Sequence, residues 1–187
     1  SQNTQDRIDN GEYPFFFFFS KVERINKYIF DTEGVITAGD GVGTGKIYHY
    51  INGKFGLHQR CYLVYNFERV SAKYFYRIFG QHFYDRVQGM TAKSSVDSVR
   101  MEMIADMPIP LPPTLAEQEK IANALSKIDQ LINDLGALIE KKKAIKQGTM
   151  QDLLTAKRRL KGFTGEWRDK KLDEMGFLTA GGTPSTI

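Results

Sequence analysis

A proline-free stretch from Thr114 to about Ala156 constrains the fold of this chain more than any other feature. Large aliphatic residues recur in it at alternating spacings of four and three, which is the a/d pattern of a coiled coil. They are Ile121, Leu125, Ile128, Ile132, Leu135 and Ile139. A helix of this length would extend about 60 Å, at roughly 1.5 Å per residue. Because its apolar face is narrow, we expect it to pack against a helical partner.

Signals on both sides delimit this helix. PIPLPP, from Pro108 to Pro113, favours a stiff extended segment that cannot continue a helix. Thr114 with Glu117 three residues later forms a capping-box signature. We therefore expect a domain over residues 1–107 and a proline-led long helix within residues 108–161. Residues 162–187 then form a linker and the opening of another domain.

Residues 1–107 have the character of strands and turns. Apolar and aromatic runs such as KYIF, GVITA, KIYHYI and RCYLVYNF alternate with Gly, Asn and Asp. The run from Phe15 to Phe19 predicts a strand buried on both faces, or partly a contact surface. Ala72–Phe83 is expected to be helical. The predicted fold class is α+β, with a β-rich domain followed by a long coiled-coil helix.

The dipeptide Asn52-Gly53 is the strongest hairpin signal in the chain. A two-residue turn there would pair Tyr50 with Phe55 and His49 with Gly56. One face of the hairpin would then carry Tyr48, Tyr50, Phe55 and Leu57 as the core side. The other face would carry His49, Lys54, His58 and Arg60 as a basic surface.

The glycine-rich sequence GDGVGTGK, from Gly39 to Lys46, suggests a phosphate-binding loop but fits neither common motif. A P-loop ending at Lys46 would need glycine where Asp40 stands and a hydroxyl where Ile47 stands. The dinucleotide-binding pattern also fails, because its third glycine is replaced by Thr44 or Lys46 in the two possible alignments. We expect a flexible turn that leads into the hairpin, with glycines that serve backbone geometry, and no bound nucleotide or other cofactor.

Composition narrows the class of protein. The formal net charge of +4 mildly favours a polyanionic partner. Cys61 is the single cysteine, so we expect no disulfide framework, a buried inert thiol and a cytoplasmic location. The longest apolar run, from Tyr13 to Phe19, is far short of the roughly 20 residues of a spanning helix, so no membrane association is expected.

Catalytic and metal-binding patterns are not found. His49 and His58 would share a hairpin face, but no third ligand follows at a suitable spacing, so no metal site is expected. Possible acidic and lysine pairs, Asp169 with Lys171 and Glu140 with Lys142, fall on a loop and on a solvated helix face. The sequence therefore predicts a binding protein without catalytic residues.

Two long segments together carry a resemblance to a known family. PIPLPPTLAEQEKIANALSKIDQLI followed by KKKAIKQGTMQDLLTAKRRL resembles the central region of type I restriction-modification specificity subunits. NTQDRIDNGEYPF, ITAGDGVGTGKIYHY and GKFGLHQRCYLVY are similar to one class of their target-recognition domains, and GFTGEW with TAGGTPST is similar to the entry to a second. The resemblance implies one recognition domain whose first strands precede Ser1, a spacer helix, and the beginning of a second recognition domain.

The resemblance also implies partners. Such a subunit reads one half of a bipartite target in double-stranded DNA and docks modification subunits, which carry out adenine methylation. A separate motor-nuclease restriction subunit joins through the complex. Candidate DNA contacts are basic or polar residues in predicted loops and on the hairpin: Lys21, Arg24, Asp40, Thr44, Lys46, His49, Lys54, His58, Arg60, Lys93, Ser94 and Ser95.

Two other functions fit the same residues. A coiled-coil adaptor without DNA binding would use the exposed aromatics to bind protein, and basic strands with tyrosines would also suit an RNA-binding module. In every case the aliphatic stripe needs a helix to cover it. Because this chain supplies one such helix, we expect a homodimer with antiparallel helices and a target that is an inverted repeat.

Overall fold

The computed structural model describes residues 2–41, 43–91 and 98–182. The chain forms two compact units, residues 1–129 and residues 130–187. Its helices and strands, in chain order, are η1 (Thr4–Asp6), β1 (Tyr13–Phe16), β2 (Glu23–Ile25), β3 (Phe30–Ala38), β4 (Tyr48–Leu57), β5 (Cys61–Tyr65), α1 (Ala72–Thr91), α2 (Met101–Ala105), α3 (Leu115–Leu154) and η2 (Leu172–Glu174). This combination of a sheet with a long helix confirms the predicted α+β class.

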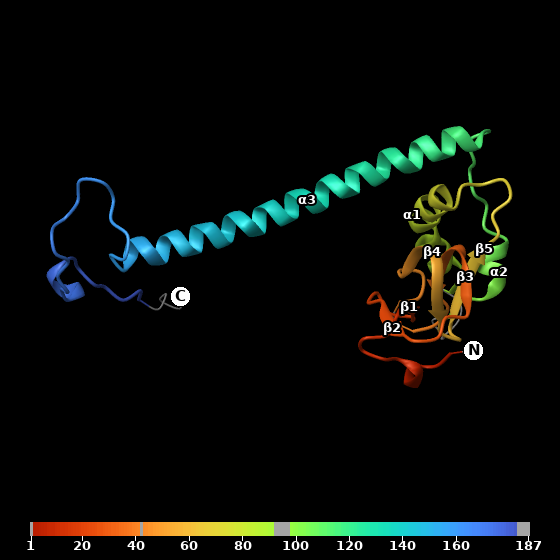
Figure 1. The fold of residues 1–187 in the computed structure, drawn as a ribbon, viewed down its shortest axis with the longest axis horizontal. Helices are drawn as coiled ribbons and strands as arrows, with labels where there is room; N and C mark the ends of the chain where they lie inside the picture. The colour runs from red at the N-terminus through yellow and green to blue at the C-terminus, as the bar shows by residue number, and fades with distance from the viewer. Residues whose placement is uncertain (1, 42, 92–97, 183–187) are drawn as a thin grey trace, which may run out of the picture. The chain divides into compact units, whose positions relative to one another are not determined.

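A five-stranded sheet of order β2-β1-β4-β3-β5 is the centre of the first unit (Figure 1). β3 and β4 pair as a long antiparallel hairpin, with Thr37 opposite Tyr48 near one end and Phe30 opposite Phe55 at the other. β5 pairs antiparallel with the other edge of β3. β1 pairs with the end of β4 in the parallel direction and carries β2 as an antiparallel neighbour.

The predicted hairpin turn at Asn52-Gly53 is wrong. Both residues lie inside β4, and they pair without a break in register with Glu33 and Thr32 of β3. The hairpin is instead formed by β3 and β4, and the glycine-rich segment after Ala38 is its connection. Asn-Gly supports a turn only when the two flanking runs pair with each other, and here each run pairs with β3.

The predicted arrangement of the core residues changes with this pairing. In a continuous strand, side chains separated by an odd number of residues point to opposite faces. Tyr48 and Tyr50 accordingly pack in the cluster around Val35, below α1. Phe55 and Leu57 pack on the other face in the cluster around Ile36. The four residues therefore do not share a face.

β4 bends sharply around the Phe16 side chain. The His49 and Phe55 rings lie 5.2 Å and 5.7 Å from the Phe16 ring, centroid to centroid. In a straight strand, residues six apart would be separated by about 20 Å. Gly53 has a φ of 125° within the bend, a value that L side chains rarely adopt. The bend folds the end of the hairpin that contains Phe30 and Phe55 back toward the end that contains Thr37 and Tyr48. Leu57 therefore lies close enough to β5 for a three-residue connection.

α1 covers one face of the sheet with an aromatic row. Phe75, Phe79 and Phe83 are buried at successive four-residue intervals, and Val87 continues the row. The Phe79 and Phe83 rings stack with centroids 4.2 Å apart. This spacing places the side chains on one helix face, which confirms the predicted helix and extends it to Thr91.

The phenylalanine run begins as a strand buried on both faces and ends at the surface. Phe15 and Phe17 pack with Ile25, whereas Phe16 points into the cluster around Ile36. The exposure of the run then rises to 50% at Phe19. The first part of the run therefore confirms the buried strand, and a contact surface at its exposed end stays a prediction.

Polar contacts attach the start of α3 to the first unit. Gln118 is 2% exposed; it accepts the Ser71 backbone N–H at 2.9 Å and donates to the Pro112 carbonyl at 3.1 Å. The Arg77 guanidinium of α1 forms an ion pair with Asp129 and donates to Ser126 at 3.1 Å. The Thr114 hydroxyl caps the helix by accepting the Glu117 backbone N–H at 3.2 Å, as predicted.

The second unit contains the rest of α3 and the segment after it. The predicted stripe is exposed, with Ile132 at 60% and Leu135 at 50%. Leu131 and Leu138, seven residues apart beside the stripe, are exposed as well and widen it. α3 ends at Leu154, within the predicted bounds of residues 108–161, and Ala156 then has a left-handed φ of 58°. In the part of the chain that is described, no helix is long and apolar enough to span a membrane.

Gly11 offers a test of how tightly β2 packs on the segment before β1. A Cβ at Gly11 would lie 2.4 Å from the Ile25 backbone nitrogen, so the backbone itself must move. We expect Gly11→Ala to lower the free energy of unfolding by about 1–3 kcal/mol in a urea titration. Gly89, inside α1 with no atom within 4 Å of an added Cβ, is the control. Gly89→Ala should raise stability by up to about 1 kcal/mol, and equal stability of the two variants would contradict the packing at Gly11.

Candidate nucleic-acid interface

Three connecting segments of the first unit meet at one end of the sheet. The segment after β1 lies against the segment after β3, because a Cβ at Gly43 would come within 2.6 Å of the Phe18 carbonyl oxygen. The β4–β5 turn joins them, since the Gly39 N–H donates to the Arg60 carbonyl at 2.8 Å. The loop end, as we call this region, comprises residues 17–20, 39–41, 43–47 and 58–60.

The glycines of the β3–β4 connection have backbone roles, as predicted. Gly41 and Gly45 have φ values of 80° and 71°, which favour glycine. Gly45 also packs against α1, where an added Cβ would lie 3.3 Å from the Val87 side chain. The described residues of the connection, 39–41 and 43–47, therefore pack closely against their neighbours.

Arg60 extends into solvent from the β4–β5 turn. Its side chain is 56% exposed, and its Nη1 atom lies 3.2 Å from Oδ2 of Asp40. Its guanidinium carbon lies 5.9 Å from the centroid of the Phe18 ring, within the range of a cation–π contact. Arg60 and Asp40 were both predicted as DNA contacts, and the structure brings them together as an ion pair.

Lys46 of the predicted loop and Lys54 of the predicted hairpin were both candidate DNA contacts, and the structure separates them. Lys46 belongs to the loop end and lies over the Tyr84 ring of α1, with Nζ 5.2 Å from the centroid. Lys54 lies 4.9 Å from the Tyr28 ring. Tyr28 in turn packs on Tyr13, at the start of β1 and away from the loop end.

His49 and His58 are not surface residues of a basic face. His58 is 4% exposed, stacks on the Phe17 ring at 5.1 Å and lies 3.5 Å from the Thr4 hydroxyl. Burial lowers the pKa of His58, and the positive charge of Arg60 lowers it further. Burial also lowers the pKa of His49, although a hydrogen bond with the Phe19 backbone opposes this in part. His49 Nε2 is buried and has no hydrogen-bond partner among the described residues.

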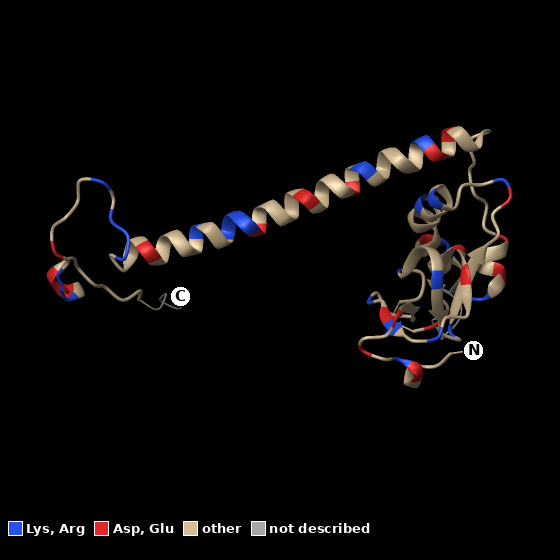
Figure 2. Ribbon diagram, in the orientation of Figure 1, with Lys and Arg blue, Asp and Glu red and all other residues tan. Residues whose placement is uncertain are grey.

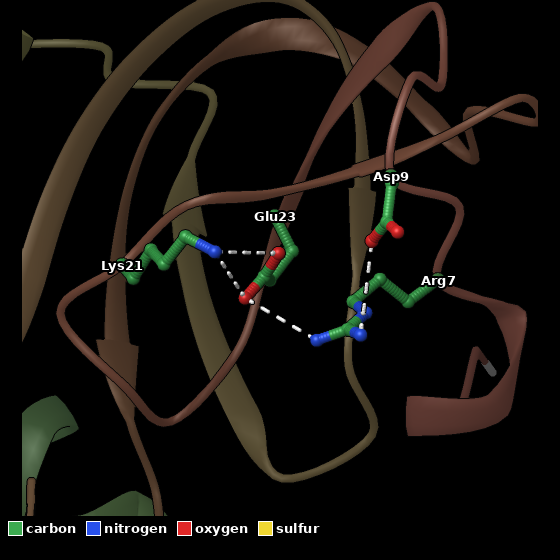
Figure 3. Close-up of polar contacts among 4 residues, drawn as sticks. All are labelled: Arg7, Asp9, Lys21 and Glu23. Atoms are coloured by element: carbon green, nitrogen blue, oxygen red, sulfur yellow. Dashed lines mark hydrogen bonds and ion pairs between the residues drawn. The ribbon is translucent and has the colours of Figure 1, made fainter.

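Lys21 and Arg24 already have protein partners. The Lys21 ammonium pairs with Glu23 at 3.2 Å, and Glu23 is shared with Arg7 at 3.6 Å (Figure 3). Arg24 donates to the backbone carbonyls of Gly11 and Glu12 at 2.9 Å and 2.7 Å. Arg24 therefore fastens the segment before β1 to β2, which is a structural role. Lys21 remains 76% exposed, so its ion pair leaves it accessible.

Thr44 is the last of the candidates among the described residues. Thr44 is 7% exposed and donates its hydroxyl hydrogen to the Gly41 carbonyl at 2.6 Å, so it supports the loop from inside. Lys93, Ser94 and Ser95 lie outside the described residues. Basic and acidic residues are interspersed over the strands (Figure 2), so charge alone does not mark the interface.

Several polar residues at the loop end were missed by the sequence analysis. Asn3, Thr4, Gln5 and Gln59 line a shallow hollow of about 300 Å³ together with Phe18, His58 and Arg60. The N-terminal segment reaches this place because Gln2 bridges to His58; the Gln2 side chain also accepts the Leu57 backbone N–H at 3.1 Å. These contacts join residues more than fifty positions apart, so no local sequence pattern predicts them.

Cys61 is a packing residue, as predicted. It lies half-buried in the cluster that contains Phe16 and Ile36. Burial raises the pKa of its thiol to about 12. The thiolate needed for nucleophilic or metal chemistry is therefore disfavoured at neutral pH.

The buried histidines make stability depend on pH. The pKa of His58 is lower in the folded than in the unfolded chain, so the unfolded chain binds the proton more readily. Stability is then full above about pH 6.5 and falls as the pH drops below it, by at most about 1.4 kcal/mol per pH unit for one proton. We expect His58→Gln to flatten the dependence of unfolding free energy on pH between 7.5 and 5. Exposed His82 is the control, and an unchanged slope in His58→Gln would contradict the assignment.

Comparison with known proteins places this fold. The family model described as type I restriction modification DNA specificity domain matches residues 1–147. The type I restriction enzyme EcoDI specificity subunit of Escherichia coli is 29% identical over 177 residues, which cover 90% of this chain and 36% of that protein. This chain thus spans little more than a third of that relative's length.

A solved structure shows the same fold. The type I restriction-modification system S subunit from M. genitalium superimposes with a TM-score of 0.61 at 19% sequence identity, over 83% of this chain and 42% of that one. The match in fold agrees with the match of the family model, which covers most of the chain. The chain therefore belongs to the family of type I restriction modification DNA specificity domains.

Proposed function

We propose that this chain recognises one half of a bipartite target in double-stranded DNA, as part of a type I restriction-modification specificity subunit. The observation that carries the proposal is the loop end, where Arg60 and Lys46 project beside an aromatic ring and a polar hollow. Sequence-specific DNA binding needs cations that position the protein on phosphates and polar groups that contact base edges. The loop end presents both on one unit, and family membership supports the same role.

The parts of the chain divide this work. In the proposal, residues 1–107 form the recognition domain, residues 108–161 the spacer helix, and residues 162–187 a linker and the beginning of a second recognition domain. The continuous helix α3 supports the spacer. Modification subunits dock on the chain, and a motor-nuclease subunit joins through them. Catalysis belongs to these partners, and this chain contributes binding.

We also infer that this chain forms a homodimer through α3. Six aliphatic residues of the stripe are exposed, and covering each one contributes roughly 1.5–3 kcal/mol. A two-fold pair of antiparallel helices would cover both stripes with one closed interface. Two identical recognition domains would then contact an inverted repeat around a nonspecific spacer.

Lys46 and Lys54 form a matched pair for testing DNA binding. Both are exposed lysines over a tyrosine ring, but Lys46 alone belongs to the loop end. With a pool of random DNA duplexes, Lys46→Ala should weaken binding and lower the slope of log affinity against log salt by about one. Lys54→Ala should leave both close to the wild-type values. If the chain were a protein-binding adaptor, neither the wild type nor any variant would bind the DNA pool. Equal effects of the two substitutions would place the DNA interface away from the loop end.

The dimer is tested by a charge on the stripe. Ile132→Lys should halve the mass measured by light scattering at micromolar concentration, because a lysine at the centre of the interface would be buried without a partner. Asn133→Lys adds the same charge beside the stripe and should leave the dimer intact. A monomeric wild-type chain, or an unchanged mass for Ile132→Lys, would contradict the dimer.

A further inference from the structure

Arg60 is an exposed cation of the first unit whose backbone is held by hydrogen bonds on both sides. Its backbone N–H donates to Nδ1 of His58 at 3.2 Å. Its carbonyl accepts the Gly39 N–H at 2.8 Å. His58 is itself buried and stacked on Phe17. The backbone that carries Arg60 is therefore tied to the core on both sides, although the residue stands in a three-residue turn.

The side chain of Arg60 is held as well. Nη1 of Arg60 lies 3.2 Å from a carboxylate oxygen of Asp40 in an ion pair, and the Phe18 ring lies beneath the guanidinium at 5.9 Å. The backbone of Asp40 is held by an isolated β-bridge to Ser98. These contacts come from the segments after β1 and β3, so two different loops determine the direction of the guanidinium. A side chain positioned in this way loses less conformational entropy when it binds.

The pairing with Asp40 decides which part of DNA suits Arg60. A carboxylate 3.2 Å from the guanidinium offsets its charge and would repel a phosphate at the same place. The acceptor atoms of a guanine base carry no formal charge and are not repelled in this way. The guanidinium has five N–H donors in a rigid fork, so donors remain beside the one nitrogen that lies against Asp40. Guanine presents O6 and N7 in the major groove at the spacing that this fork matches.

We propose that Arg60, positioned by Asp40 and Phe18, reads a guanine through the major groove of the half-site. Arg60 is the specificity-determining residue, and Asp40 is a positioning residue that acts through it. The inference rests on the proposed DNA recognition and adds the base that one residue reads. Lys46, which lies over Tyr84, remains suited to phosphate.

The experiment compares the sites that the variants select. The chain, co-expressed with its modification subunits, is incubated with a library of random DNA duplexes, and the bound molecules are sequenced. The half-site selected by the wild-type chain should contain a guanine at one position. The Arg60→Lys and Asp40→Asn variants should each lose the preference for guanine at that position. Lysine cannot form the bidentate contact, so Arg60→Lys should reduce the discrimination at this position by roughly 5- to 150-fold. The other positions should keep their preferences.

The salt dependence separates this role from a phosphate contact. Asp40→Asn removes a negative charge, so its binding to random DNA should not weaken and its salt slope should not fall. Lys46→Ala is the control, with weaker binding to all sequences and an unchanged consensus. Thermal melting checks that each variant is folded. If Arg60→Lys is unstable, the Asp40→Asn variant alone tests the guanine preference. An unchanged consensus in both Arg60→Lys and Asp40→Asn, or a uniform loss over all sequences, overturns the assignment of guanine. A wild-type complex that selects no duplex overturns the proposed function itself.

Discussion

The packing of the β3–β4 hairpin around Phe16 is the contact on which the rest of the first unit depends. Without the bend, His49 and Phe55 could not both lie against the Phe16 ring. The bend brings the end of β4 back toward the start of β5, and the short turn between them carries Arg60. A buried aromatic side chain on β1 thus determines where the exposed residues of the loop end are displayed.

The loop end combines rigid backbone with paired charge. Glycines allow the β3–β4 connection to pack against Phe18 and α1, and the buried His58 ties the β4–β5 turn to the core. The ion pair of Arg60 with Asp40 reduces the general attraction for phosphate while it orients the guanidinium. Such a surface favours discrimination between sequences over strong binding to any DNA, which suits a subunit whose proposed task is recognition.

The helix α3 meets the first unit through polar contacts and leaves its apolar stripe uncovered. The buried Gln118 side chain bonds the Ser71 and Pro112 backbones at the start of the helix, and Arg77 pairs with the half-exposed Asp129. Unpaired groups at these positions would be costly, so these contacts specify one attachment. The aliphatic residues beyond Asp129 are exposed and remain available to a partner. Different side chains of α3 therefore attach the helix to the first unit and remain exposed for a partner helix.

The sequence by itself determined the two long helices and the α+β class. Helical hydrogen bonds are local, and so are the four-residue spacings that separate Phe75 from Phe79 and Ile121 from Leu125. The sequence also excluded a phosphate-binding loop through Asp40 and Ile47. The strand pairing was decided only by the tertiary structure: Asn52-Gly53 fits a turn as well as a bend, and the choice depends on β3. The site was decided there too. Arg60 could be named as a basic residue of the predicted hairpin, but its contacts with Asp40 and Phe18 join residues twenty or more positions apart. The burial of His58 follows from packing that no local pattern encodes.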